Sequence, residues 1–372
     1  MRSALFFFLS LTGAAIASPS NASSTETPHT RKYFYTGGQY VADSDGDHTW
    51  TDQLYVEQLT PVGGATKENP IVFIHGQAQT GTNWLNKADG SPGWSSFFLG
   101  QGYQVYIVDQ TYRGRSPTTP GLSTSAYSAE LLQQRFTAPE LYMLWPQADK
   151  HTQWPGNGTQ GDQYFDDYYI STVPFMSGDA VAQQTSFQSA GAALLDRIGT
   201  PAVLVAHSQG GLMPWLLADA RPDLVKSIVS LEPTGPPFRE AVFSSSSSRP
   251  YGITDAPLTY DPPVSDPATD LVQQVYPGNA TAGISDCVLQ SSNSTVRKLV
   301  NLEKIPTVLV TSESSYHVPY DWCTVKFLQQ AGVPTEHMFL PDVGIEGNAH
   351  MMFLEENSDE VAAAINNWIV SN

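Results

Sequence analysis

Basic residues are scarce in this sequence of 372 residues, which has 18 Lys and Arg against 36 Asp and Glu and a formal net charge of -18 at pH 7. Nucleic acids and anionic membrane surfaces are bound mainly through clustered cations, so this balance argues against both as partners. Charged residues of either sign make up only 15% of the chain, whereas hydrophobic residues make up 41%. A disordered chain has the opposite balance, so we expect a folded protein with a large core.

Long apolar runs are also rare, and the one that stands out lies at residues 4–16. It is shorter than the roughly 20 residues that a membrane-spanning helix needs. Ala15-Ile16-Ala17 has the small-x-small pattern that precedes signal-peptide cleavage. We therefore predict a signal peptide over residues 1–17 and a secreted, extracellular protein without an integral membrane segment; an uncleaved anchor is the alternative. Residues 18–30 are rich in Ser, Thr and Pro, and we expect a flexible leader there.

Cysteine is nearly absent, since Cys287 and Cys323 are the only two. In the oxidising surroundings of a secreted protein two cysteines usually pair, so we predict a Cys287–Cys323 disulfide; two buried thiols are the alternative. Four N-x-S/T sequons agree with secretion from a eukaryotic cell. These candidate glycosylation sites are Asn21, Asn157, Asn279 and Asn293.

From residue 70 onward, short apolar runs rich in β-branched residues alternate with segments of helical periodicity. Continuous apolar runs are typical of parallel strands that are covered on both faces. The predicted strands are 71–74, 105–108, 203–206, 228–231, 308–310 and 337–340, and the predicted helices are 93–100, 181–198, 212–220, 321–331 and 358–370. This alternation predicts an α/β protein with a mostly parallel central sheet, helices on both faces and right-handed crossovers.

Before residue 70 the pattern favours antiparallel structure. Residues 32–41 predict a hairpin, and residues 52–59 alternate as an antiparallel strand does. Asp43, Asp45 and Asp47 alternate as in a calcium-binding loop, but Leu54 stands where the loop of an EF-hand has its glutamate. We interpret the three aspartates as a solvated turn and expect no metal site.

Two connections, at about 118–180 and 233–304, are too long for ordinary loops. Stretches of this length inside a compact domain are usually functional. We interpret them as two lid-like insertions over one edge of a single domain that covers residues 31–372. Aromatic residues of the first insertion are candidates for an apolar substrate pocket: Tyr164, Phe165, Tyr168 and Tyr169.

The strongest catalytic signal is VLVAHSQGG at residues 203–211, where a predicted strand ends at a serine and a helix follows. A sharp turn between strand and helix lifts a serine hydroxyl out of the sheet, and it needs small neighbours such as Ala206 and Gly210. The helix N-terminus then supplies positive potential for an anionic intermediate. We predict Ser208 as a nucleophile, and an incidental serine is the alternative. His207 is expected to point the other way.

An acyl-transfer site also needs donors for a developing oxyanion, usually two backbone N–H groups. The residue after the nucleophile, Gln209, is expected to supply one of them. His75-Gly76-Gln77 follows the first buried strand, and the N–H of Gln77 is expected to supply the other. We interpret the His75 ring as a structural group that ties this loop.

A serine hydroxyl near neutral pH needs an adjacent base. Among the eight histidines, His350 lies in Gly347-Asn348-Ala349-His350, after the last predicted strand, where catalytic groups collect in such sheets. We therefore predict His350 as the base, with a packed core histidine as the alternative. His317 and His337 are the histidines that are harder to dismiss.

An acidic residue is needed to orient the base. Glu232 ends the strand after the nucleophile helix, so it is expected at the carboxyl edge of the sheet beside the nucleophile strand. We predict Glu232 as this acid, and the rivals are Glu313, Asp321 and Asp342.

Arg113-Gly114-Arg115 follows the second buried strand and could contact an anionic substrate. We prefer a turn held by bonds from arginine to backbone or carboxylate groups.

With these residues assigned, the sequence resembles the secreted bacterial and fungal esterases of the α/β-hydrolase superfamily whose triad is Ser-Glu-His, with the glutamate after the sixth strand. The matching stretches are YFYTGGQYV (33–41), LYVEQLTP (54–61), PIVFIHGQAQTGTNW (70–84), GWSSFFLGQGYQVYIVDQTYRGRSP (93–117), AHSQGG (206–211), LEP (231–233) and GNAH (347–350). The resemblance implies an α/β-hydrolase fold and carboxylester hydrolysis without a metal or cofactor. It also implies Ser208, Glu232 and His350 as nucleophile, acid and base.

Two functions from different classes fit these observations. The first is a secreted serine carboxylester hydrolase that acts through an acyl-enzyme on a neutral or hydrophobic ester, either a small molecule or a lipid-like one. A lactone, a polyester or an amide could take the place of the ester on the same triad. The second is a non-catalytic binding protein on the same scaffold. Such proteins normally lack a triad member, and all three candidates are present here, so we favour the enzyme.

Overall fold

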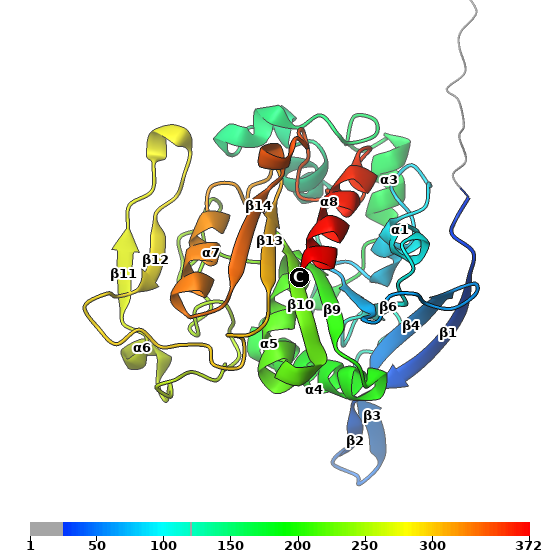
Figure 1. Ribbon diagram of the computed structural model, residues 1–372, viewed down its shortest axis with the longest axis horizontal. Helices are drawn as coiled ribbons and strands as arrows, with labels where there is room; N and C mark the ends of the chain where they lie inside the picture. Colours follow the sequence, from blue (N-terminus) through cyan, green and yellow to red (C-terminus); the bar gives the residue numbers. More distant parts are fainter. Residues whose placement is uncertain (1–24, 120) are drawn as a thin grey trace, which may run out of the picture.

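The computed structural model of the protein describes residues 25–119 and 121–372, and its centre is an eight-stranded sheet in the order β1-β4-β6-β5-β9-β10-β13-β14 (Figure 1). These strands are β1 (His29–Thr36), β4 (Leu54–Pro61), β5 (Ile71–Ile74), β6 (Val105–Asp109), β9 (Ala202–His207), β10 (Val225–Leu231), β13 (Thr307–Thr311) and β14 (Thr335–Phe339). Neighbours from β6 to β14 pair in parallel, whereas β4 pairs antiparallel with β1 and β6. The mostly parallel sheet is therefore confirmed. The predicted signal peptide over residues 1–17 and Asn21 lie outside the described residues.

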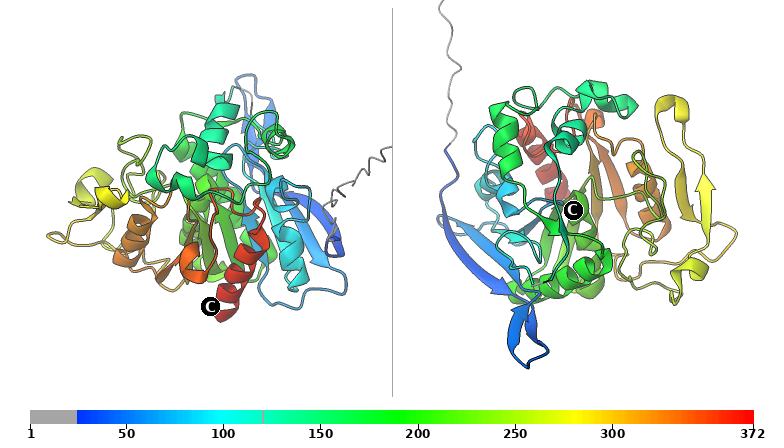
Figure 2. Two further views of the ribbon diagram at one scale, coloured as in Figure 1. Left: turned by 90° about the horizontal axis from the view of Figure 1, so that it is seen from above. Right: turned by 180° about the vertical axis from the view of Figure 1, so that it is seen from behind.

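Side chains of the central strands alternate between two cores, one on each face of the sheet. In β5, Val72 and Ile74 belong to one core, and Ile71 and Phe73 belong to the other. The first face is covered by α4 (Ala180–Ile198), α5 (Met213–Ala220) and α7 (Asp321–Gln330), and the second by α1 (Trp94–Gly100) and α8 (Ser358–Ser371) (Figures 1 and 2). These are the five helices that the sequence predicted, and they lie on both faces as expected.

The hairpin predicted over residues 32–41 is wrong. β1 pairs with β4 instead, and β2 (Gln39–Ala42) pairs with β3 (His48–Thr51). Gly37 and Gly38 have φ of 70° and 76°, a conformation that glycine adopts without strain. They turn the chain out of the sheet into the β2–β3 hairpin, which projects from the body of the molecule (Figure 1).

The aspartate turn and the leader lie on either side of β1 and β2. The Asp43 side chain accepts the backbone N–H groups of Asp45 and Asp47, so the aspartates close the β2–β3 hairpin as a solvated turn. The leader expected to extend to Thr30 ends sooner, because the N–H of Thr27 donates to Ser96 Oγ at 2.8 Å and β1 begins at His29.

The first insertion folds into short elements over the carboxyl ends of the parallel strands, whereas the helix and strands of the second insertion lie beside α7 (Figure 1). The first contains β7 (Thr124–Ser125), α2 (Ala129–Leu132), the π-helix η2 (Gln133–Thr137), η3 (Pro139–Leu141), η4 (Pro146–Lys150), α3 (Gln163–Ile170) and β8 (Phe175–Met176). The second contains α6 (Pro267–Asp270), β11 (Gln273–Tyr276), η7 (Ala280–Ala282) and β12 (Cys287–Gln290). The remaining short helices are η1 (Gly81–Trp84), η5 (Ser208–Leu212), η6 (Pro222–Leu224) and η8 (Leu340–Val343).

The aromatic residues expected to line the substrate pocket have a different role. Phe165 and Tyr168 are buried in the core beside α1 and α8, and Gln79 Nε2 donates to the Tyr168 hydroxyl at 2.9 Å. Tyr164 and Tyr169 lie on the same helix, α3, and the cavity that contains Ser208 is lined by other residues. The prediction is wrong because α3 packs against the body of the domain rather than over the cavity.

The disulfide joins the second insertion to the helices that cover the sheet. Cys287 at the start of β12 is bonded to Cys323 in α7, as the sequence predicted, over a separation of 36 residues. A crosslink across a loop of this length is worth about 3–4 kcal/mol in the loop-entropy model.

Candidate active site

Ser208 lies in the turn between β9 and α5, where η5 begins the helix. Its φ is 56°, a left-handed conformation in which a residue other than glycine is strained. Such strained turns display a nucleophile at the edge of a sheet. Gly210 permits the turn, because a Cβ at this position would lie 2.2 Å from the carbonyl oxygen of His75. Ser208 lines a cavity of about 380 Å³ between the two insertions.

Glu232 and His350 are 118 residues apart in the sequence and meet at this cavity. Nδ1 of His350 donates to Oε2 of Glu232 at 2.7 Å, and both side chains are buried. Glu232 follows β10 directly and has φ of 44°, so the nucleophile and the acid both occupy left-handed turns at strand ends. Because Nδ1 carries the proton in this bond, Nε2 is left with a lone pair.

Two serines hold the Glu232 carboxylate. The Ser312 N–H donates to Oε1 at 2.8 Å, and the Ser315 hydroxyl donates to Oε2 at 2.6 Å. The Ser312 hydroxyl also donates to Oε1. Burial raises the pKa of Glu232, and these donors act in the opposite direction because they stabilise the carboxylate.

The three rival acids have other partners or positions. Glu313 forms an ion pair with Lys150 at 2.8 Å, and Asp321 accepts Nδ1 of His317 at 3.0 Å. Asp342 is exposed in η8. Of the four candidates, Glu232 is the one that contacts His350.

Nε2 of His350 faces the cavity beside Tyr316, whose hydroxyl lies 3.2 Å away. Burial lowers the pKa of His350 well below its usual value, and the neighbouring His317 lowers it further. The imidazole is therefore neutral at pH 7. Burial also raises the pKa of the Tyr316 phenol, so its hydroxyl keeps its proton and donates to Nε2. Ser208 lines the same cavity as His350. The hydrogen bond between a nucleophile and its base commonly tightens only when substrate binds.

His207 was expected to point away from the site, and this prediction is wrong. Its Nε2 donates to the carbonyl oxygen of His350 at 2.9 Å, and the two rings lie 4.4 Å apart. Burial lowers the pKa of His207, so the ring is neutral. His207 therefore holds the backbone of the predicted base. No periodic pattern indicates this contact, because it depends on a loop that lies 143 residues away in the chain.

Gln209 follows Ser208 directly, and one arginine joins its side chain to the loop that carries Gln77, the other predicted oxyanion donor. Gln77 lines the cavity and accepts the Tyr127 hydroxyl through its side chain at 2.8 Å. Arg113 donates to the Gly76 carbonyl at 2.8 Å and to the Gln209 side chain at 3.1 Å. Within the described ranges, neither the Gln77 nor the Gln209 backbone N–H donates to another protein group.

The turn at residues 113–115 is held as the sequence indicated. Arg115 pairs with Asp109 and Glu57, each at 2.8 Å. Arg113 is 1% exposed, and burial lowers the pKa of its guanidinium to about 9, so it is still a cation near neutral pH. The loop after β5 is also tied, because the Gln110 N–H donates to Nε2 of His75 at 2.9 Å. His75 therefore has a structural contact.

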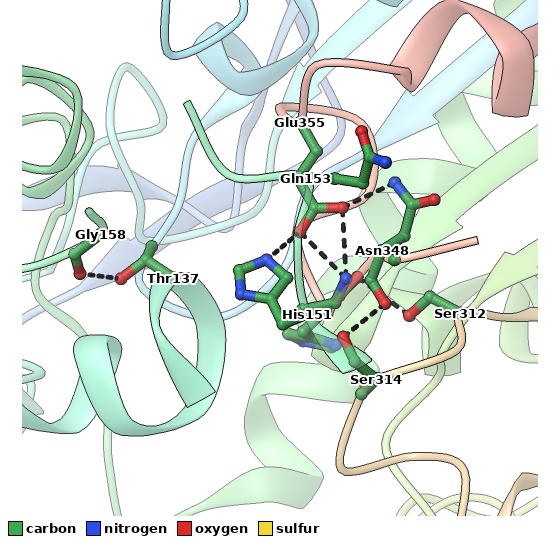
Figure 3. A network of polar contacts seen from close by, with 12 residues as sticks. Thr137, His151, Gln153, Gly158, Ser312, Ser314, Asn348 and Glu355 are labelled. Carbon is green, nitrogen blue, oxygen red and sulfur yellow. Dashed lines mark hydrogen bonds and ion pairs between the residues drawn. The ribbon is translucent and has the colours of Figure 1, made fainter. Parts of the chain in front are cut away.

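A buried carboxylate, Glu355, fixes the loop that carries His350, and Figure 3 shows it at the centre of a polar network. It accepts the Ala349 N–H at 3.0 Å and the Asn348 side chain at 2.7 Å. It also contacts Nε2 of His151 at 3.0 Å, while Nδ1 of His151 contacts Glu140 at 2.8 Å.

The network links the first insertion to the loop of the predicted base. Burial lowers the pKa of His151, but the hydrogen bonds that its ring donates to Glu140 and Glu355 outweigh this effect and raise the pKa to about 9. Glu355 was not among the residues predicted from the sequence. Its signal is an acidic residue that follows the apolar run MMFL, three residues before the last helix begins at Ser358.

Three side chains of the site could also hold a metal ion, since Glu232, His317 and His350 offer ligand atoms within 4.8 Å of one another. Both oxygens of Glu232 already accept hydrogen bonds from Ser312, Ser315 and His350. The carboxylate is therefore satisfied by protein donors.

The surface features predicted from the sequence are placed as follows. Asn157, Asn279 and Asn293 are exposed. In the two described ranges, no helix combines the length and the apolar character needed to cross a membrane.

The chain is similar to known proteins in sequence and in fold. Residues 71–364 match the family described as "Alpha/beta hydrolase family". The chain is 44% identical over 338 residues to "Probable secreted lipase phiG" from Fungal sp. (strain ATCC 74256), a match that covers 91% of this chain and 88% of that protein.

Among solved structures, that of "a Novel Bacterial Esterase" superimposes with a TM-score of 0.61 at 22% identity. It covers 95% of this chain and 99% of the other. This likeness concerns the fold, and the expected α/β-hydrolase fold is confirmed.

Proposed function

The chain belongs to the alpha/beta hydrolase family, and from this premise we propose that it is a secreted serine hydrolase that cleaves carboxylic esters through an acyl-enzyme. The observation that carries the proposal is that a strained Ser208 and a neutral, carboxylate-bonded His350 line one cavity. The related protein described as a probable secreted lipase supports both the ester chemistry and the secretion.

In the proposed reaction, Nε2 of His350 takes the proton of Ser208 while the hydroxyl oxygen attacks the ester carbonyl. The carbonyl oxygen becomes an oxyanion, which the backbone N–H groups of Gln77 and Gln209 stabilise. The imidazolium then donates its proton to the leaving alcohol, and an acyl-enzyme remains on Ser208. A water molecule, deprotonated by His350, attacks the acyl carbonyl and releases the acid.

Glu232 keeps the proton of His350 on Nδ1 and stabilises the imidazolium that forms in each half-reaction. The Tyr316 hydroxyl donates to Nε2 of His350 in the structure. Its hydroxyl must yield that lone pair to Ser208 when substrate enters. Arg113 acts as a positioning residue, because its bonds to Gly76 and Gln209 hold the two backbone segments that supply the oxyanion donors.

The cavity walls suit the apolar body of an ester. Tyr127, Phe136, Phe243 and Tyr316 all line the cavity, and its volume of about 380 Å³ is at the small end of the range for ligand pockets. This size favours a short or medium-sized ester. The exposed positions of Asn157, Asn279 and Asn293 are consistent with glycosylation of a secreted chain.

The experiment that tests this proposal is labelling with a fluorophosphonate probe followed by peptide mass spectrometry. We expect the peptide that contains Ser208 to gain the mass of the probe in folded protein. Ser208→Ala and heat-unfolded wild type, as controls, should gain none. Labelling at another serine, or no labelling of folded wild type, would contradict the proposal.

A further inference from the structure

Arg135 is a cation in the catalytic cavity that has no carboxylate partner. It lines the same cavity as Ser208. Its Nε is buried and, within the described ranges, has no hydrogen-bond partner. No ion pair joins Arg135 to an acidic side chain of residues 25–119 or 121–372.

Most other arginines of the described residues have a carboxylate partner. Five of the eight form ion pairs with Asp or Glu, and three do not: the first group is Arg31, Arg115, Arg221, Arg249 and Arg297, and the second is Arg113, Arg197 and Arg239. Glu240 is the carboxylate that lines the cavity together with Arg135, and its Oε1 is bonded to Arg249 at 2.6 Å. The charge of Arg135 is therefore left uncompensated at the place where a substrate would bind.

The backbone directs Arg135 into this position. It belongs to η2, a short π-helix, and segments of this kind frequently mark functional sites. Its neighbour Phe136 lies with its ring 4.9 Å from the ring of His350, so the same turn contacts the predicted base.

The guanidinium is also held in place. Its central carbon lies over the Phe243 ring, 3.8 Å from the centroid, so a cation–π contact restrains the group. A guanidinium held over a ring can still present N–H groups to a planar, bidentate partner. Carboxylate is the common organic anion that matches these N–H groups.

We propose that Arg135 binds a carboxylate on the substrate, so that the enzyme prefers esters that carry a negative charge. This inference rests on the proposed ester hydrolysis and replaces the neutral substrate expected from the sequence. The carboxylate can belong to the acid half or to the alcohol half of the ester. In both cases it lies against Arg135 while the ester carbonyl lies at Ser208, and the aromatic walls around the cation strengthen the pairing by excluding water.

The test compares matched charged and neutral esters. For the acid half, the pair is 4-nitrophenyl hydrogen glutarate and 4-nitrophenyl 5-methylhexanoate, in which an isopropyl group replaces the carboxylate at the same position. For the alcohol half, the pair is 4-acetoxybenzoate and 4-isopropylphenyl acetate. The ratio of kcat/KM, charged over neutral, is measured for each pair, so that differences in intrinsic reactivity cancel when variants are compared.

We expect Arg135→Met to lower this ratio by about tenfold or more in one of the two pairs, which identifies the half that carries the charge. Arg135→Lys should keep part of the preference, because it keeps the cation but loses the planar fork. Arg197→Gln is the matched control: Arg197 stacks on Phe34 at the same 3.8 Å, and it lies on α4 outside the cavity. It should leave both ratios unchanged.

The proposal is overturned if the ratio in Arg135→Met stays within twofold of wild type in both pairs. An equal loss of kcat/KM on charged and neutral esters is one such case, and it would mean that Arg135 only supports the cavity wall.

A binding measurement separates this inference from the proposed catalysis. In a Ser208→Ala background, calorimetry with glutaric acid monoanilide should show binding that is weakened about tenfold or more by Arg135→Met. The neutral 5-methylhexananilide should show no such dependence. If wild type cleaves no ester but this dependence is seen, the proposed function fails and the anion site stands. If ester cleavage is seen and neither this binding nor the kcat/KM ratio of either ester pair depends on Arg135, the anion site fails alone.

Discussion

Two histidine–carboxylate pairs lie side by side at the cavity, Glu232–His350 and Asp321–His317. The two imidazole rings are stacked, with centroids 5.0 Å apart and planes inclined by 6°. All four side chains are buried, and each Nδ1 faces a carboxylate oxygen, at 2.7 Å in the first pair and 3.0 Å in the second. The hydrogen bond to an acid therefore does not by itself distinguish a catalytic histidine.

The two pairs differ in what surrounds them. Asp321 and His317 are four residues apart at the start of α7, and the second oxygen of Asp321 accepts the Thr311 hydroxyl at 2.8 Å. Glu232–His350 joins two distant loops, and further groups hold it: two serines on Glu232, His207 on the His350 carbonyl and Glu355 on the preceding residue. We infer that the pair held from several directions is the catalytic one, and that the local pair supports it by packing.

The largest expected difference is between the two histidines. His350→Gln should lower kcat by about ten-thousandfold or more, because the base is lost and only binding and the oxyanion donors remain. His317→Gln should lower it by less than about tenfold, because only a stacking partner is lost. Steady-state kinetics with 4-nitrophenyl butyrate, with circular dichroism as a check of folding, measures both. An inactive, folded His317→Gln beside an active His350→Gln would reverse the assignment.

Substitution of the two carboxylates should lower kcat in the same order, with the larger loss at Glu232 and the smaller at Asp321. The difference should be smaller than that between the two histidines. Glu232→Gln should fold and lose about a thousandfold or more in kcat, since an amide no longer holds the reactive tautomer of His350. Asp321→Asn is the matched change in the other pair and should reduce kcat by less than about tenfold. The assignment of the acid is wrong if Glu232→Gln keeps near-normal activity while Asp321→Asn or Glu313→Gln is inactive.

The pH dependence of kcat/KM also distinguishes the two histidines. His350 acts as a base only when neutral, so activity is lost as pH falls through its pKa, and burial holds this pKa well below the usual 6.5. The acid limb of kcat/KM should therefore lie below pH 6.5. In His317→Gln it should move to higher pH, because His317 contributes to the lowering. A limb at or above 6.5 in wild type, or a shift to lower pH in the variant, would contradict this account.

The last prediction concerns the free energy of unfolding and His151. This residue holds the loop of His350 through Glu355 and has no such contact with the His317 pair. Its pKa is raised from 6.5 to about 9 in the folded protein. The stabilisation is fully present below pH 6.5 and is lost as pH rises through about 9, with an amplitude on the order of 3 kcal/mol. Urea unfolding at both ends of this window should show the loss in wild type and not in His151→Gln. His48→Gln, in the exposed β2–β3 hairpin, is the control. An equal loss in His151→Gln would place its cause elsewhere.

Sequence reasoning worked best where one element determines the position of a residue. Strands at 71–74 and 203–206 were predicted because buried parallel strands are continuous apolar runs, and β5 and β9 lie there. The same logic located Ser208 and Glu232, since each is placed by the end of its own strand. β14 was misplaced by two residues at its start, because its polar residues Glu336 and His337 give it no apolar run.

Predictions from the sequence were wrong or absent where the position of a residue depends on partners far away in the chain. Strand β1 has the same local pattern whether it pairs with β2 or β4, and the buried residues Leu54 and Val56 of β4 decide the matter only in three dimensions. The aromatic residues that line the cavity, such as Tyr127 and Phe243, come from both insertions, whose short elements have little periodicity of their own. The contacts of His207 and Glu355 with the His350 loop likewise require the folded chain.

Hydrolysis of a 4-nitrophenyl ester series from acetate to palmitate, by wild type and Ser208→Ala side by side, tests the central claim most directly. The account predicts clear turnover by wild type, an optimum at short or medium chains to match the cavity, and loss of activity in a folded Ser208→Ala. Equal turnover by the two proteins, or none by folded wild type on any of these esters, would contradict it.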